Sequence, residues 1–460
     1  MPQTIVALAT PTGRSGIGVV RLSGQGALRI TQSITAGSFS PRPRTAHLRQ
    51  LVDTTSGEVI DEALITYFKA PHSFTGEDVI EISCHGSPVL LRQIIDLCLA
   101  TGARMAEAGE FSLRALANGQ INLAEAEAIR DLIDAQTTAS ARQAVRQMSG
   151  EFSRQLQPLK DELLNVIVVL ESALEFVEDD LPATQVERLR TSLTDIACDV
   201  AKLADTFRAG HLIRDGLRVA IVGRPNVGKS SLFNALLGSE RAIVTEIAGT
   251  TRDHLHERFT IHNIPISLID TAGLRDTTDM VESIGVARSR SLMSDADIVV
   301  VMLDVNEEIT DEDQAIIESV RDITHLFALN KIDKLQNRED DREVLEQVKS
   351  AIGNPRSAIV STSAKTGEGL DELKRAIIAP FSADDVNTSG FLVTDARHHD
   401  LLVRAKTEIE NSMENLDREM SEEIVLIGLH NALRYLGEIT GETTTEDMLT
   451  RIFSTFCIGK

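Results

Sequence analysis

The sequence lacks any long apolar run. Of its 460 residues 42% are hydrophobic, yet none of its apolar stretches approaches the about 18 consecutive residues of a membrane-spanning helix. The opening MPQTIVALATPTG has no basic segment followed by an apolar one, so it is not a secretory signal. It indicates instead a strand over residues 4–10. We expect a cytoplasmic protein without a membrane span.

An excess of positive charge is also absent. The chain has 46 Lys and Arg against 69 Asp and Glu, a net charge of −23. Broad, sequence-independent binding of nucleic acid needs basic side chains that displace counterions, so the charge argues against it. It leaves room for a nucleic-acid substrate that a more basic partner holds.

Cysteine is scarce, and its spacing excludes two classes of site. The four residues are Cys84, Cys98, Cys198 and Cys457, and no pair of them forms the C-x-x-C of a zinc or thioredoxin motif. A disulfide is not expected in a cytoplasm. Cys98 and Cys198 lie in helix-like apolar patterns, which predicts that both are core residues. The role of Cys457, in the terminal FCIGK, stays open at this point.

The chain contains three successive patterns, which predict a multidomain α/β protein. Residues 1–118 mix strand and helix signals and indicate an α+β domain. Residues 119–215 and 379–460 show apolar stripes stepping by 3 and 4, for example from Leu156 to Leu174 and from Leu189 to Phe207, typical of packed helices. Residues 216–378 alternate short apolar strands with helices, typical of a parallel sheet. We expect one helical domain with the α/β domain inserted into it; two separate bundles are the alternative.

The second helical part carries two smaller predictions. Thr443 and Glu446 form a capping-box pattern that would open the last helix. His398 and His399 have no third ligand at helical spacing, so we predict a surface pair rather than a metal site.

A phosphate-binding loop is the most specific motif of the sequence. GRPNVGKS, residues 223–230, fits G-x-x-x-x-G-K-[ST] and stands between a strand and a helix. Gly223 and Gly228 let backbone N–H groups approach phosphates. Lys229 would reach the outer phosphates and the Ser230 hydroxyl would ligate Mg²⁺.

Three further motifs predict which base is bound. In NKID, Asp333 can accept both N1–H and N2–H of guanine, a donor pair that adenine lacks; Asn330 would brace the site and the stem of Lys331 would cover the base. SAK, residues 363–365, can offer a backbone N–H to guanine O6. In DTAG, Asp270 can hold Mg²⁺ through water and the Gly273 N–H can meet the γ-phosphate. The four motifs, in this order, predict a GTPase of the translation-factor-like class.

The predicted GTP site includes residues beyond the four motifs, and it departs from the Ras-like pattern at one position. Where Ras-like GTPases have a glutamine that orients the attacking water, this chain has Leu274, so hydrolysis needs another device. The predicted GTP-binding residues are Asn226, Val227, Gly228, Lys229, Ser230, Ser231, Thr245, Glu246, Ile247, Ala248, Gly249, Thr250, Thr251, Asp270, Thr271, Ala272, Gly273, Asn330, Lys331, Asp333, Ser363, Ala364 and Lys365.

Four further stretches add to these motifs: GTTRD at 249–253, DTAGLR at 270–275, SFTGEDVIEISCHG near residue 80 and the terminal CIGK. Together they resemble the MnmE (TrmE) family of tRNA modification GTPases. The resemblance covers essentially the whole chain. It implies a homodimer whose N-terminal domain dimerises and binds a 5-formyl- or methylene-tetrahydrofolate derivative. It also implies a heterotetramer with the FAD protein MnmG. The two proteins together would add an aminomethyl or carboxymethylaminomethyl group at C5 of the wobble uridine of certain tRNAs.

The resemblance also implies metal ligands and a catalytic carboxylate. K⁺ would be held by Asn226, Thr245, Ile247 and Thr250, and Mg²⁺ by Ser230 and Thr251. In the family a K⁺ ion beside the nucleotide supplies charge as an arginine finger does. Glu282 matches the residue that polarises the attacking water through a second water, the task that Leu274 cannot perform. Judged without the resemblance, Glu282 would count as a solvated carboxylate on a helix.

The implied folate site comprises Arg21, Glu81 and Lys460, with Gln120 where many family members have lysine. A neutral amide binds a carboxylate less strongly than an ammonium does. From the sequence alone, Arg21 could equally form a structural ion pair. The resemblance implies a catalytic thiol at Cys457, with a small apolar residue closing the last helix as the alternative. Glu282, Cys457 and Lys229 are therefore the predicted catalytic residues.

Two other functions are consistent with a GTPase domain. A ribosome-assembly switch like Era or Der is one, but Der has two tandem G domains and Era ends in a basic RNA-binding domain, whereas this chain has one G domain and an acidic helical end. A folate-dependent one-carbon enzyme regulated by GTP is the other.

Overall fold

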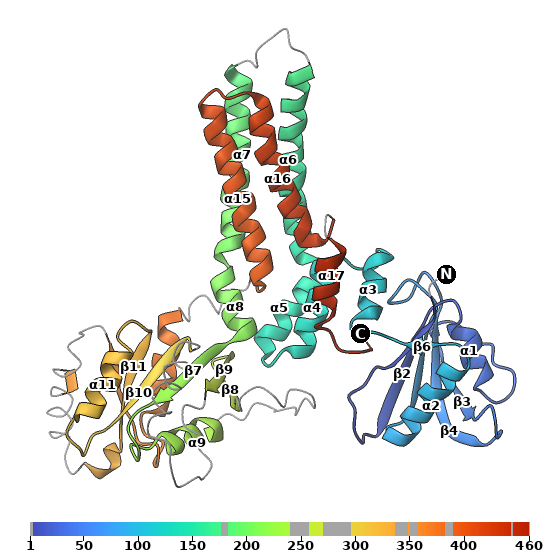
Figure 1. The fold of residues 1–460 in the computed structure, drawn as a ribbon, viewed down its shortest axis with the longest axis horizontal. Coiled ribbons are helices and arrows are strands. Elements are labelled where there is room, and N and C mark those ends of the chain that lie inside the picture. Colours follow the sequence, from blue (N-terminus) through green and yellow to red (C-terminus); the bar gives the residue numbers. More distant parts are fainter. Residues whose placement is uncertain are drawn as a thin grey trace. The chain divides into compact units, whose positions relative to one another are not determined.

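The computed structural model describes residues 3–175, 183–239, 257–269, 296–335, 348–349, 357–381, 390–442 and 445–459 (Figure 1). The chain divides into two compact units. One consists of Met1–Ile133, Val145–Ala197 and Arg404–Lys460, and the other of Asp134–Ala144 and Cys198–Val403. No helix in the described ranges is long and apolar enough to cross a membrane.

A six-stranded sheet forms the N-terminal part of the first unit. Its order is β3-β4-β5-β2-β1-β6, with only β6 parallel to its neighbour β1. Helices α1 and α2 cover one face (Figure 1), where Ile30 and Ile94 join the apolar core. The strands are β1 (Ile5–Leu8), β2 (Ile17–Ser23), β3 (Ala46–Val52), β4 (Val59–Phe68), β5 (Val79–His85) and β6 (Arg104–Met105), and the helices α1 (Ala27–Ser33) and α2 (Pro88–Ala100).

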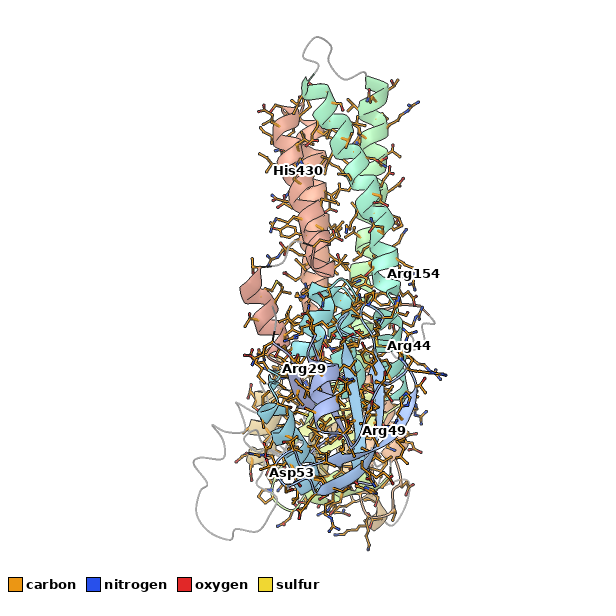
Figure 2. All side chains as sticks on the ribbon, turned by 90° about the vertical axis from the view of Figure 1, so that its right-hand side faces the viewer. Arg29, Arg44, Arg49, Asp53, Arg154 and His430 are labelled. Atoms are coloured by element: carbon orange, nitrogen blue, oxygen red, sulfur yellow. The ribbon has the colours of Figure 1, made fainter. Side chains whose placement is uncertain are left out.

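Long helices follow, as the apolar stripes predicted. In α6 the stripe residues Leu156, Leu163 and Ile167 are buried, and α6 packs along α16. His430, which Figure 2 shows on α16, lies 3.3 Å from Glu171 of α6. The helices are α3 (Glu110–Ala117), α4 (Leu123–Asp134), α5 (Thr138–Met148), α6 (Glu151–Glu175), α7 (Ala183–Asp205), α8 (Phe207–Asp215), α15 (Ala396–Asp417), α16 (Glu422–Thr440) and α17 (Glu446–Phe453).

The second unit contains another six-stranded sheet, with the order β12-β11-β10-β7-β9-β8. The central strand β10 is buried throughout, and α9 and α13 pack on one face while α11 packs on the other. The parallel sheet confirms the predicted fold class. The edge strand β8 is antiparallel to β9, which the parallel pattern did not predict. The elements are β7 (Leu217–Val222), α9 (Lys229–Ser239), β8 (Glu257–Ile261), β9 (Ile264–Ile269), β10 (Ile298–Asp304), α11 (Asp311–Ser319), β11 (His325–Asn330), the 3₁₀ turns η1 (Ile332–Lys334) and η2 (Ala379–Phe381), β12 (Ala358–Ser361) and α13 (Leu370–Ile378).

Two side-chain predictions are wrong, and helix geometry explains both. Cys198 is exposed rather than in the core, because it lies two positions from the buried Ile196 and therefore on the opposite side of α7. His398 is fully buried rather than on the surface, because it continues the α15 stripe of Leu401 and Leu402. The neighbouring His399 stacks on the Phe207 ring, with centroids 4.4 Å apart.

The last helix begins differently from the prediction. Its N-cap residue is Thr445, so Glu446 occupies the first helical position instead of the third. A capping box needs the acidic residue at the third position, so the predicted pairing with Thr443, which lies outside the described residues, is wrong.

Candidate functional site

The phosphate loop lies between β7 and α9, as its motif predicts. Its turn requires the left-handed region at Asn226 and Gly228, where φ is 64° and 105°. A Cβ on Gly228 would stand 2.2 Å from the amide nitrogen of Asn330, so only glycine fits there. A turn of this shape can direct the backbone N–H groups of the loop toward one anion.

The side chain of Lys229 curls back over the loop. Its Nζ donates to the carbonyl oxygens of Gly223 and Arg224, both at 2.7 Å. Burial lowers the pKa of Lys229, because desolvation disfavours the charged form. A phosphate bound in the loop would supply the negative charge that favours the protonated lysine.

Asn330 holds the two ends of the nucleotide site together. It ends β11 and is buried; its Nδ2 donates to the Val227 carbonyl at 2.8 Å, and its Oδ1 accepts from the Ala364 N–H at 3.0 Å. Lys331 follows with a φ of 70° and donates to the Asn226 carbonyl at 2.7 Å. The NKID motif therefore contacts the phosphate loop directly, and the SAK motif contacts NKID.

Asp333 and Ser363 meet at the ends of neighbouring parallel strands. The Ser363 hydroxyl, itself fully buried, donates to Asp333 Oδ1 at 2.7 Å. The Asp333 side chain is otherwise exposed. One carboxylate oxygen is thus braced, and the other has no hydrogen bond from the described residues, as recognition of an N–H donor pair requires.

Two braces of this site were not among the predicted residues. Asp304, at the end of β10, pairs with Lys331 Nζ at 2.6 Å. Asp313 on α11 is 1% exposed and pairs with Arg224 of the phosphate loop at 2.7 Å. The sequence did contain signals for both: an aspartate that ends a wholly apolar strand, and the T-x-x-D capping pattern of Thr310 and Asp313.

Many of the predicted site residues have no described position. The residues that lie outside the described ranges are Thr245, Glu246, Ile247, Ala248, Gly249, Thr250, Thr251, Asp270, Thr271, Ala272, Gly273, Glu282 and Lys460. The described remainder of the nucleotide set, from Asn226 to Ser231 and from Asn330 to Lys365, is brought together at one edge of the second sheet.

The residues predicted for folate binding partly converge in the first unit. Arg21 on β2 and Glu81 on β5 are register partners, and Arg21 Nε and Nη2 donate to Glu81 Oε1 at 2.9 and 2.7 Å. Arg21 Nη1 also donates to the carbonyl of Gly459 at 3.2 Å, and Cys457 is exposed. The exposed Gln120 contacts neither; its Nε2 lies 3.5 Å from the Asn118 carbonyl.

A strand, a glycine-shaped loop with its lysine, and a braced aspartate at the neighbouring strand ends define a P-loop GTPase. Residues 4–120 match the family described as GTP-binding protein TrmE N-terminus, and residues 123–457 match the MnmE helical domain. The chain belongs to the MnmE family of tRNA modification GTPases.

Curated relatives support this assignment along the entire chain. The tRNA modification GTPase MnmE of Aquifex aeolicus is 43% identical over 100% of both chains, and that of Koribacter versatilis is also 43% identical over 100% of both. A solved G domain of the T. maritima FeoB iron transporter is 31% identical, covering 35% of this chain and 97% of that chain, with a TM-score of 0.26. The family assignment rests on the relatives and the two family matches.

Proposed function

We propose that this chain is a K⁺-dependent GTPase that, together with MnmG, adds an aminomethyl or carboxymethylaminomethyl group at C5 of the wobble uridine of certain tRNAs. The observation that carries the proposal is the braced Asp333 beside the phosphate loop, in a chain whose full length matches the MnmE family. Residues 1–118 would dimerise and bind folate, 216–378 would form the G domain, and 119–215 with 379–460 the helical domain.

The described residues fit a guanine nucleotide. Asp333 would accept N1–H and N2–H, and the loop N–H groups with Lys229 would hold the phosphates. Because the Ala364 N–H already donates to Asn330, we assign the contact with guanine O6 to the Lys365 N–H, which has no hydrogen bond within the described part of the chain. This assignment refines the role of the SAK motif to one atom.

The cations would be held by loop and switch residues. Ser230 and Thr251 would hold Mg²⁺, and Asn226, Thr245, Ile247 and Thr250 would hold K⁺. Within the described residues the Asn226 side chain makes no hydrogen bond, so its amide oxygen fits the role of a ligand. A cation there stabilises the negative charge that develops on the phosphates during cleavage.

Glu282 would orient the attacking water in place of Leu274, which has no polar atom to do so. GTP-dependent pairing of the two G domains of a homodimer, followed by separation on hydrolysis, would move the helical domain and gate the modification site. Cys457 would act in the one-carbon step beside Arg21, Glu81, Gln120 and Lys460.

The salt dependence of GTP hydrolysis tests the proposal. Wild type should hydrolyse GTP faster in K⁺ than in Na⁺, and Asn226→Ala should lose this difference while still binding GTP. Asn234→Ala is the matched control, because Asn234 is exposed on α9 and is not among the proposed nucleotide or cation residues. Equal wild-type rates in the two salts would remove the K⁺ assignment.

A further inference from the structure

The C-terminal tail, defined here as residues 454–459, is bound to the first unit by backbone contacts. Ile458 forms an antiparallel bridge with Ala108, and the Gly109 N–H donates to the Cys457 carbonyl at 3.5 Å. Gly459 is buried with a φ of 99°, and a Cβ there would stand 2.3 Å from the Leu8 carbonyl oxygen. At residue 459 the tail therefore lies so close to the Leu8 backbone that only glycine fits.

The guanidinium of Arg21 joins the tail to the sheet. Two of its nitrogens donate to Glu81 and a third donates to the Gly459 carbonyl. The Arg21 side chain is 19% exposed, so these donors lie in a partly dry setting where a misplaced carbonyl is costly. The Gly459 carbonyl of the tail is therefore the third acceptor of an arginine that also pairs with Glu81.

An apolar cluster places α17 but does not fix the turn beyond it. Phe453 and Phe456 pack with Leu123 and Ala126. Hydrophobic packing is non-directional, so this cluster sets the depth of the helix rather than the direction in which the tail leaves it. Backbone hydrogen bonds shape the turn itself, since the N–H groups of Ser454, Thr455 and Phe456 donate to carbonyls of α17. They do not supply a directional contact between the turn and α4.

Arg130 on α4 supplies that contact. Its Nη1 donates to the Thr455 hydroxyl at 3.0 Å, and its guanidinium carbon lies 5.9 Å from the centre of the Phe456 ring. The planar guanidinium can make an edge-on hydrogen bond and a face-on ring contact together, which lysine reproduces only in part. Both contacts fall immediately before Cys457.

We propose that Arg130 is a positioning residue for the one-carbon site: it clamps the turn at Thr455 and Phe456 and thereby holds Cys457 and the Gly459 carbonyl beside Arg21 and Glu81. The one-carbon role rests on the proposed function, whereas the clamp itself rests on the contacts above. Arg130 would act on Arg21 and Glu81 through the tail.

The test follows a spin label on Cys457 in the full chain. Cys198, the other exposed cysteine, is first changed to serine; Cys84 and Cys98 are buried. Arg130→Ala should convert the label from an immobile to a mobile spectrum and weaken the binding of 5-formyltetrahydrofolate about tenfold, as loss of a charged hydrogen bond implies. Arg130→Lys should give intermediate values for both.

Two further variants make the test decisive. Thr455→Val removes the hydroxyl that accepts from Arg130 and donates to the Ile452 carbonyl at 2.7 Å. It should shift label mobility in the same direction by a smaller amount, even if Arg130→Ala fails to fold. Arg92→Ala is the control, since the Arg92 side chain is 81% exposed and, among the residues that the structure describes, pairs with Asp96 of its own helix; it should change neither readout. Far-UV circular dichroism and the thermal midpoint of each variant report whether the chain has folded.

Unchanged label mobility in folded Arg130→Ala would overturn the proposal, and so would weakened folate binding with an immobile label. If the wild type itself does not bind 5-formyltetrahydrofolate, the folate part of the proposed function fails. Label mobility then still decides whether Arg130 clamps the tail, so the two failures are distinguishable.

Discussion

Asp333 is the single residue whose chemistry is most specific to one ligand. Its Oδ1 is held by the Ser363 hydroxyl at 2.7 Å, and its remaining acceptor sites suit a ligand with adjacent N–H donors. Guanine has such a pair, and adenine presents an acceptor at N1. In the proposed function the choice of base therefore depends on the acceptor character of one carboxylate.

Asp333→Asn should change the preferred base. The amide brings N–H donors to the position where guanine also donates, so GTP affinity should fall about 100-fold. Xanthine carries a carbonyl in place of the 2-amino group, and XTP should therefore bind better than GTP. Titration of fluorescent GTP and XTP measures this exchange. Ser363→Ala removes the brace on Asp333 and the acceptor of the Thr366 N–H; it should weaken both nucleotides without exchanging their order.

Glu110 shows how arginine pairing changes a buried carboxyl. Burial raises the pKa of Glu110, but hydrogen bonds from Arg104, the Glu107 N–H and Arg114 outweigh it and lower the pKa from 4.5 to about 2. The Arg104 and Arg114 contacts measure 2.5 and 2.8 Å. A pKa drop of this size corresponds to about 3 kcal/mol of folding free energy.

Glu110→Gln should therefore destabilise the first unit by about 3 kcal/mol at pH 7. Because the folded pKa is depressed, this stabilisation is present above pH 4.5 and is lost as the pH falls toward 2. The difference in thermal midpoint between variant and wild type should accordingly shrink below pH 4.5. A difference that stays constant down to the lowest accessible pH would contradict the ionic origin of the effect.

At the scale of elements, residues 390–395 lead into α15 and contact α5 and the start of α8; they are called the return segment here. The Gln143 side chain of α5 accepts from the Leu392 N–H and donates to the Gly390 carbonyl. The Thr206 hydroxyl, just before α8, accepts from the Val393 N–H at 3.0 Å. The chain therefore enters and leaves the G domain through segments that are packed on each other.

Gly210 on α8 is the closest point of this packing. A Cβ at Gly210 would stand 2.1 Å from the Val393 carbonyl oxygen, so Gly210→Ala must displace backbone and should cost about 2 kcal/mol. Gly238→Ala on α9 is the matched control, since its Cβ would meet nothing within 4 Å. There alanine should stabilise the helix by about 1 kcal/mol. Calorimetric midpoints that move in the same direction for both variants would refute this packing argument.

At the scale of the whole molecule, the nucleotide site and the proposed folate site are built in different ways. The nucleotide residues follow strand ends that the parallel sheet brings to one edge, so motif spacing and strand order were enough to predict their meeting. The first unit instead joins Arg21 to Gly459 across almost the entire chain. Only the family resemblance pointed to that proximity.

What the sequence could not predict follows from packing. The sequence of α15 does not show whether its buried stripe begins at His398 or at Leu401, and only the structure shows that His398 is buried. Cys198 has apolar neighbours in sequence, although the helix turns it away from them. The Arg130 contact with Thr455 depends on how α17 lies on α3 and α4, which local sequence does not determine.

The function of the whole molecule is tested most directly by mass spectrometry of tRNA nucleosides from cells that lack this chain. The account predicts that the C5-modified wobble uridine disappears, that the wild-type chain restores it, and that Lys229→Ala, with an incomplete phosphate site, does not. Persistence of the modified uridine in cells without the chain would contradict the account and favour a ribosome-assembly switch.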